Sequence, residues 1–148
     1  GNLTREYVEN TTFLRSYREA PHTDIAQTVL EAGISANLSC GGVYFGAPAD
    51  FSPATCKDCD NQRRLTEEWH GAGNGQILVD ASIHGEYTSH HPLWQWMADY
   101  AREHGLGMHV HISETRTEHA ECLARHGKTP IQVLNDYGDA RPCLRDPV

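Results

Sequence analysis

The chain has 148 residues and a formal net charge of -8, with 39% apolar and 22% charged residues. This composition is typical of a soluble globular protein with one ordinary core. The acidic balance argues against nucleic acid or an anionic membrane as a partner. No apolar run reaches the roughly 18 residues of a membrane span, and the charged first twenty residues do not resemble a signal peptide, so we expect a cytoplasmic protein.

Strand-like and helix-like segments alternate along the chain. Strands are expected at 11–13, 34–40, 76–84 and 106–112. Helices are expected from Thr23 or Asp24 to Gly33, from Ser52-Pro53 to Gly71, from Pro92 to Gly105, over 117–126, and from Thr129-Pro130 onward. Segment 71–75 is expected to be a loop, and the tail from Gly138 has no periodicity. This alternation predicts βα units, a parallel sheet and therefore an α/β fold.

The strand at 76–84 shows which way its two faces point. Ile77, Val79, Ala81 and Ile83 alternate with polar residues that include Asp80, Ser82 and His84. Covering helices must pack on the apolar face, which leaves the polar face toward a common interior. We therefore predict part of a (β/α) barrel, with about four parallel strands and functional groups near the strand ends.

Five cysteines are scattered along the chain, at positions 40, 56, 59, 122 and 143. Their odd number predicts free thiols rather than a disulfide framework. Cys56 and Cys59 form a single CxxC inside the helix expected from Ser52-Pro53, so a chance pair of helix residues is the favoured interpretation. The chain begins at Gly1, and its only methionines are Met97 and Met108, so we expect that the start of the reading frame is missing or has been removed.

Segment 108–115 carries the strongest chemical pattern. His109 and His111 share one face of the expected strand, and Glu114 follows three residues after His111. Imidazole nitrogen can hold a divalent ion, and a nearby carboxylate can move protons, as metal-assisted hydrolysis requires. The alternative is a pair of hydrogen-bonded polar residues with no metal.

Two segments carry a resemblance to a known family. Segment 105–115, followed by Glu118 and by the run from Gly127 to Leu134, resembles the strand-5 region of the amidohydrolase superfamily. The similar branch contains purine and pterin deaminases, triazine hydrolases and related cyclic-amine hydrolases, where H-x-H-x-x-E-T precedes Y-G-K-R-P-V-x-x-L. Segment 83–89 resembles the H-A-P-Y-T element after strand 4 of that branch.

The resemblance implies a role for three residues. His111 would be a metal ligand, Glu114 the proton shuttle and His84 a substrate contact, whereas His109 has no firm counterpart. Glu86 stands where the family more often has proline. The implied cofactor is a divalent metal ion, with zinc expected. The implied fold is a partial (β/α)8 TIM barrel covering strands 2 to 5, so that residues 1–148 form one domain truncated at both ends.

The expected function is that of a fragment of a metal-dependent amidohydrolase. Such an enzyme hydrolyses C–N bonds of a cyclic or heterocyclic small molecule, in a deaminase-like reaction with metal-activated water. The fragment alone is expected to be inactive, because zinc in a catalytic site needs about three protein ligands. The alternatives are a small zinc-binding module using His109, His111 and a cysteine, or a catalytically silent α/β interaction domain. A homo-oligomer is left open.

Overall fold

The computed structural model describes residues 23–136. In chain order the elements are α3 (Thr23–Glu31), β1 (Ala36–Leu38), η1 (Pro48–Asp50), α4 (Lys57–Trp69), α5 (Ala72–Gly75), β2 (Ile77–Val79), β3 (Ala81–Gly85), η2 (Glu86–Thr88), α6 (His91–His104), β4 (Met108–His111), α7 (Arg116–His126) and α8 (Pro130–Asp136). The strand expected at 11–13 and the tail from Gly138 lie outside the described residues. Between residues 23 and 136, the helices are too short or too polar to span a membrane.

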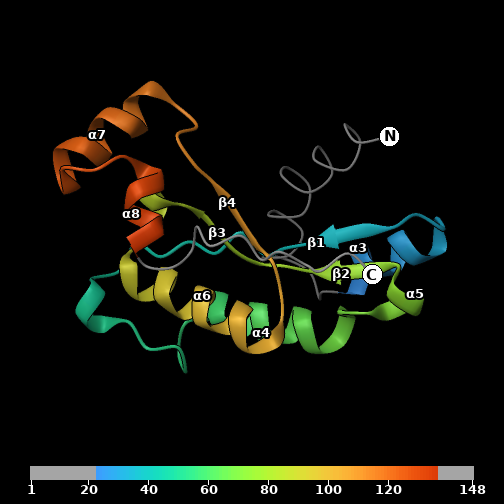
Figure 1. Cartoon of the computed structure of the whole chain (residues 1–148). Helices are drawn as coiled ribbons and strands as arrows, with labels where there is room; N and C mark the ends of the chain where they lie inside the picture. Colours follow the sequence, from blue (N-terminus) through green and yellow to red (C-terminus); the bar gives the residue numbers. More distant parts are fainter. Residues whose placement is uncertain (1–22, 137–148) are drawn as a thin grey trace.

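The strands run parallel, in the order of the chain (Figure 1). β1 pairs with β2, and β3 pairs with β4. Asp80 alone separates β2 from β3. A parallel bridge between Gly42, which follows β1, and Ile83 of β3 continues the pairing of β1 with β2. The predicted parallel, sequential arrangement is therefore confirmed for three of the four expected strand segments.

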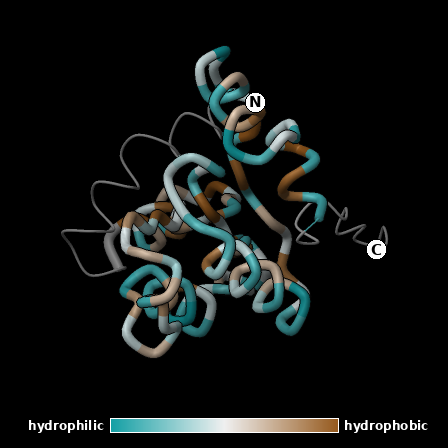
Figure 2. Tube along the Cα trace, turned by 90° about the vertical axis from the view of Figure 1, so that its left-hand side faces the viewer, coloured by the Kyte–Doolittle hydropathy of each residue, from teal (hydrophilic) through white to brown (hydrophobic). Residues whose placement is uncertain are grey.

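The core lies between these strands and the helices that Figure 1 shows on one side of them, α4 and α6. The apolar set predicted for one face, Ile77, Val79, Ala81 and Ile83, is buried to 1% exposure or less. Leu65 of α4 and Leu93 and Met97 of α6 are fully buried in the same cluster. Figure 2 shows hydrophobic segments in the interior of the trace and hydrophilic ones toward its outside. Burial of apolar side chains at about 25 cal/mol per Å² is the main stabilising contribution in such a core.

The expected start of the helix at Ser52-Pro53 is wrong. Thr55 and Cys56 donate backbone hydrogen bonds to the Ser52 carbonyl, so residues 52–56 form a separate turn. Cys56 then takes an extended conformation, with φ -74° and ψ 116°, and α4 begins only at Lys57. The CxxC motif therefore starts at the N-cap of α4 instead of lying within the helix.

The loop expected at 71–75 is largely confirmed. The structure forms one irregular turn there, α5, in which Gly73 and Asn74 have left-handed backbone angles. Glycine adopts such angles without steric penalty, which explains why the glycine-rich segment can reverse the chain in so few residues.

Candidate functional site

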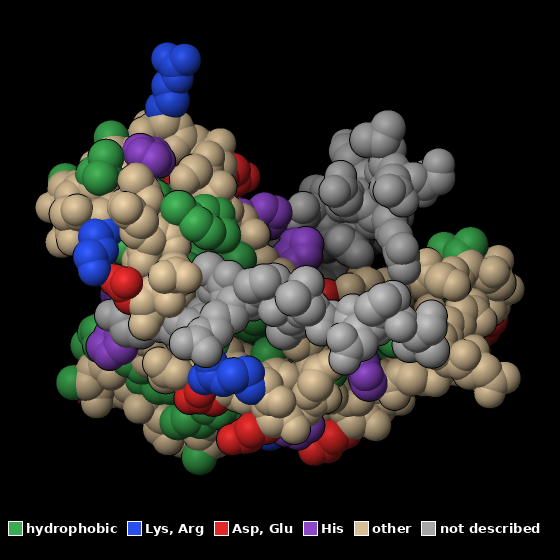
Figure 3. All heavy atoms as spheres, in the orientation of Figure 1, with side chains coloured by type: hydrophobic (Ala, Val, Ile, Leu, Met, Phe, Trp, Pro, Cys, Tyr) green, Lys and Arg blue, Asp and Glu red, His purple; other side chains and the backbone are tan. Residues whose placement is uncertain are grey.

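The site lies where β3 and β4 end. Gly85 and His111 are opposite each other in the pairing, after an irregularity that begins at Ser82. Parallel strands end on the same side of a sheet, and the rings of His84 and His111 lie 5.1 Å apart between centroids. In Figure 3, histidine side chains reach the surface in the region where Figure 1 draws β4. The two histidines singled out from the sequence are thus neighbours at one edge.

His84 has a defined hydrogen-bonding direction. Its Nδ1 lies 3.1 Å from the Thr88 hydroxyl, and that hydroxyl donates to the Gly85 carbonyl at 3.2 Å. Because the Thr88 proton is used in this second bond, the Thr88 oxygen accepts from the Nδ1–H of His84. In the neutral ring with its proton on Nδ1, Nε2 is the acceptor nitrogen.

Tyr87 connects His84 to Glu114. The Tyr87 hydroxyl donates to Oε2 of Glu114 at 3.0 Å, and the Tyr87 ring lies 5.8 Å from the His84 ring. Desolvation and the hydrogen bond to Glu114 raise the pKa of Tyr87, so the hydroxyl remains a donor at neutral pH. The Glu114 side chain is exposed, which leaves its carboxylate accessible to a bound molecule.

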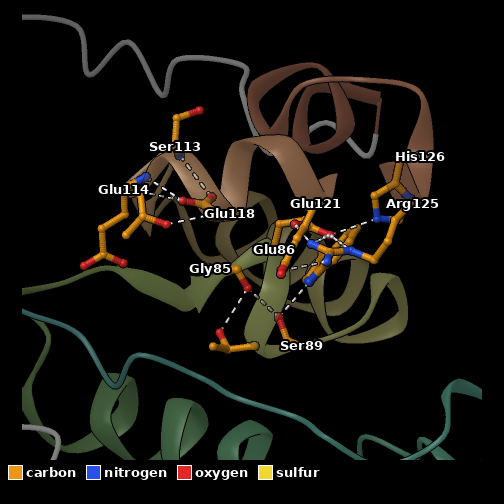
Figure 4. Close-up of polar contacts among 12 residues, drawn as sticks. Gly85, Glu86, Ser89, Ser113, Glu114, Glu118, Glu121, Arg125 and His126 are labelled. Atoms are coloured by element: carbon orange, nitrogen blue, oxygen red, sulfur yellow. Dashed lines mark hydrogen bonds and ion pairs between the residues drawn. The ribbon is translucent and has the colours of Figure 1, made fainter. Parts of the chain in front are cut away.

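A second carboxylate fixes the backbone beneath Glu114. The Glu118 carboxylate accepts from the backbone N–H groups of Ser113 at 3.0 Å, Glu114 at 2.5 Å and Thr115 at 3.3 Å. The Thr115 hydroxyl in turn accepts a hydrogen bond from the Glu118 backbone N–H, which completes a capping box at the start of α7. Figure 4 shows Glu118 turned to these amides while the Glu114 side chain points away from them. The backbone that carries Glu114 is therefore held without engaging its side chain.

Glu86 anchors the loop that carries Tyr87. It is 3% exposed and accepts from Arg125 Nη2 at 2.8 Å and from His126 Nε2 at 2.8 Å, both on α7 (Figure 4). Burial by itself raises the pKa of Glu86, but the hydrogen bonds from Arg125 and His126 outweigh it and hold the pKa below its ordinary value. The glutamate at the position where the family more often has proline therefore ties η2 to α7.

Deeper in the strands, the polar inner face is closed by hydrogen bonds. Asp80 accepts from the Asn37 amide and, at 3.1 Å, from the Gly107 backbone N–H. His109 is opposite Ser82 in the pairing, and its ring lies 5.7 Å from that of His111. His109 thus lies one layer below the site, as the strand spacing predicts.

The donor chemistry at the strand ends suits a divalent metal in part. His84 and His111 offer imidazole nitrogens and Glu114 a carboxylate, which are zinc ligand types. These three do not form a close set of metal ligands. Within residues 23–136 the set close enough to share an ion is Glu86, Cys122 and His126. The Glu86 carboxylate there is already neutralised by Arg125, whose charge would repel a cation.

Sequence reasoning singled out His84, His111 and Glu114 as candidates but did not anticipate the residues that contact them and their backbone. Glu118 follows Thr115 at the spacing of a capping box, a local signal that was available. The contacts made by Glu86 and Tyr87 join segments 27 to 40 residues apart, and no local pattern in the sequence indicates them.

Parallel strands joined by helices, with histidines and a carboxylate at the strand ends, define part of an α/β barrel. The chain belongs to the amidohydrolase family, whose model matches residues 7–145. The predicted family resemblance is confirmed.

Relatives and solved structures agree with this assignment. The chain is 34% identical over 115 residues to a 5-methylthioadenosine/S-adenosylhomocysteine deaminase of Caldanaerobacter subterraneus, covering 78% of this chain and 26% of that protein. It is 32% identical over 132 residues to a 5'-deoxyadenosine deaminase of Methanothermobacter thermautotrophicus, covering 89% and 30%. The chain therefore spans less than a third of either relative.

The structural similarity shows the same fold. A guanine deaminase from C. acetobutylicum with bound guanine matches with a TM-score of 0.66 at 14% identity, over 78% of this chain and 28% of that one. A zinc-bound adenosine deaminase from Xanthomonas campestris matches with a TM-score of 0.63 at 20% identity, over 78% and 26%. The predicted partial TIM-barrel fold is confirmed by these neighbours.

Proposed function

We propose that this chain is the part of an amidohydrolase-family deaminase that carries one metal ligand and the proton-transferring carboxylate. The 148 residues would be an internal portion of a barrel domain truncated at both ends. The proposed reaction is hydrolysis of a C–N bond in a small heterocyclic substrate. The observation that carries the proposal is a chain of contacts at the strand ends: the His111 ring lies beside that of His84, His84 lies beside Tyr87, and Tyr87 donates to Glu114.

His111 is the proposed metal ligand. When bound, a divalent ion such as zinc supplies a nucleophile near neutral pH by lowering the pKa of water. A catalytic zinc site uses about three protein ligands, so the partners of His111 would come from outside the described residues. The position of His111 at the last residue of β4 supports this, because ligands in barrels stand at the carboxyl ends of strands.

Glu114 is the proposed proton shuttle. Its carboxylate would take a proton from the attacking water and deliver it to the leaving nitrogen, a role worth about 10²- to 10⁴-fold in rate. The Tyr87 hydroxyl on Oε2 orients the carboxylate, and the Glu118 capping box holds its backbone. The side chain is thereby positioned while Oε1 is left for the reaction.

His84 is the proposed substrate contact. With Nδ1–H directed to Thr88, Nε2 of the neutral ring would accept a hydrogen bond from an N–H or O–H of the substrate. The names of the relatives favour an aminopurine or its nucleoside as that substrate. We also infer a cytoplasmic location, which the free thiols at Cys40, Cys56, Cys59 and Cys122 support.

The test uses the gene product that contains this segment, purified with zinc. Ammonia release is measured from 5'-deoxyadenosine, 5-methylthioadenosine and guanine, together with bound metal. Glu114→Gln should lower kcat at least about 100-fold while metal content is retained. His111→Ala should lose metal and activity together, whereas Glu121→Gln, on the exposed side of α7, should match the wild type.

The 148-residue chain alone should bind zinc weakly and show no turnover, because it supplies too few ligands. Wild-type kcat in both Glu114→Gln and His111→Ala would overturn the proposal. Turnover by the short chain that disappears in His111→Ala would instead show that the segment completes a site by itself.

A further inference from the structure

The two cysteines of the CxxC motif occupy unequal places at the start of α4. Cys56 is the N-cap residue and Cys59 lies three residues later, in the first helical turn. Cys59 is fully buried, whereas Cys56 is 9% exposed. Ala54, Thr55 and Lys57 around Cys56 are exposed, so Cys56 lies close beneath the protein surface.

The thiols are in direct contact, and the local field favours charge on one of them. The side chains of Cys56 and Cys59 are hydrogen-bonded to each other. The hydrogen bond from Cys59 lowers the pKa of Cys56, although burial opposes it. With the help of the backbone N–H groups of Cys59 and Asp58, the pKa of Cys56 falls to about 6. A thiolate at a helix N-terminus is stabilised in this way in redox-active CxxC motifs.

The neighbouring charges do not reverse this asymmetry. The Asp58 carboxylate raises the pKa of Cys56 only weakly compared with the hydrogen bonds that lower it. This carboxylate accepts a hydrogen bond from the Val43 backbone N–H at 2.9 Å. The hydrogen bond to Cys56 and burial both raise the pKa of Cys59, while Arg63 lowers it. Cys56 is thus suited to attack, and Cys59 to act second.

We infer that Cys56 and Cys59 form a reversible redox-active dithiol that exchanges with small-molecule disulfides such as oxidised glutathione. The Cys56 thiolate attacks one sulfur of the small disulfide, forms a mixed disulfide and releases one thiolate. Cys59 then gives its proton to solvent and attacks Cys56 Sγ, which closes the protein disulfide and releases the second thiolate. One disulfide is reduced to two thiols while two protein thiols become one disulfide.

The second step is helped by the first. Charge on Cys56 is one reason that Cys59 holds its proton, and that charge disappears when Cys56 enters the mixed disulfide. The remaining thiols are poor competitors: burial raises the pKa of Cys40 to about 12 and that of Cys122 to about 11. Reactivity should therefore be confined to Cys56 among the four described cysteines.

The experiment uses the 148-residue chain with Cys143→Ser, so that the cysteine outside the described residues does not contribute. The protein is equilibrated with defined ratios of oxidised to reduced glutathione, quenched with acid and iodoacetamide, and analysed by peptide mass spectrometry. We expect a Cys56–Cys59 disulfide in the parent and a stable glutathione adduct on Cys56 in Cys59→Ser. Cys56→Ser should form neither, and Cys122→Ser, the matched control, should behave as the parent.

A rate measurement does not depend on the fold of any CxxC variant. The alkylation rate of Cys56 in the parent should rise with a midpoint near pH 6. Compared with an ordinary thiol of pKa about 8.5, this gives roughly 30-fold more thiolate at pH 7. A dithiol that stays reduced at every glutathione ratio, adducts mainly on Cys40 or Cys122, or a Cys56 midpoint above pH 8 would each overturn the inference. None of these outcomes depends on deaminase activity.

Discussion

Replacing Glu86 by glutamine tests the ion pair that ties η2 to α7. The carboxylate side chain is 2% exposed, whereas the side chains of Arg125 and His126 are 41% and 36% exposed. Breaking a fully buried ion pair costs about 3–5 kcal/mol, but here both donors can be rehydrated and glutamine retains one acceptor. We therefore expect Glu86→Gln to lower the free energy of unfolding by about 2 kcal/mol.

The assay is thermal and urea unfolding followed by circular dichroism at pH 7. For a chain of this size, about 2 kcal/mol corresponds to a fall in Tm of about 4–8 °C. Glu121→Gln is the matched control, because its carboxylate pairs with the same Arg125 at 3.4 Å but is 59% exposed. Exposed pairs contribute about 0–1 kcal/mol. Equal losses in the two variants would refute the reasoning that burial makes the Glu86 contact strong.

The pH dependence gives a second check with a defined sign. The folded-state pKa of Glu86 lies below the ordinary value of 4.5, so the ionised form is favoured by folding. Its contribution is complete above that value and is lost as the pH falls through the folded-state pKa. The stability difference between the wild type and Glu86→Gln should therefore shrink as the pH falls below 4.5. A difference that grows in acid would contradict the assigned direction.

Two further predictions concern backbone contacts near the site. Glu118→Ala removes the acceptor for three amides, so it should lower the free energy of unfolding by about 1–2 kcal/mol and speed amide hydrogen exchange at residues 113–115. Glu118→Gln retains one acceptor and should lose less stability. Unchanged exchange in both variants would show that the cap does not hold this turn. Gly42→Ala places a Cβ 3.0 Å from the Ser82 carbonyl oxygen and 3.1 Å from Met97 Cε. Chemical denaturation should therefore show a free energy of unfolding lower by about 1–3 kcal/mol. Wild-type stability would mean that the backbone at the bridge to Ile83 has room to adjust.

Much of the fold follows from patterns of period two and of helix spacing. The alternation of Ile77, Val79 and Ala81 located a strand and its buried face, and the first-turn proline placed the start of α6 within one residue. The start of α4 was misplaced because Ser52-Pro53 resembles a helix cap. Asp58 and Asp60, which suit a first helical turn, indicate the true start.

The candidate site was predictable only in part for a physical reason. His84, His111 and Glu114 could be singled out because they lie at or just beyond the ends of alternating strands and match the family resemblance. Their mutual orientation depends on Tyr87 and Glu86, whose partners lie on elements distant in the sequence. Such contacts are set by the docking of η2 on α7, which is a property of the assembled fold.

The Glu118 capping box also limits how this protein could be altered by insertion or deletion. One carboxylate accepts hydrogen bonds from three consecutive backbone N–H groups, so the number of residues between Ser113 and α7 is fixed. A residue inserted between Ser113 and Glu118 would both break the capping box and displace Glu114. Residues 44–50 differ, since most of them are exposed and they contribute no strand pairing. Length variation is therefore expected in the loop after β1, while the turn after β4 keeps a fixed length.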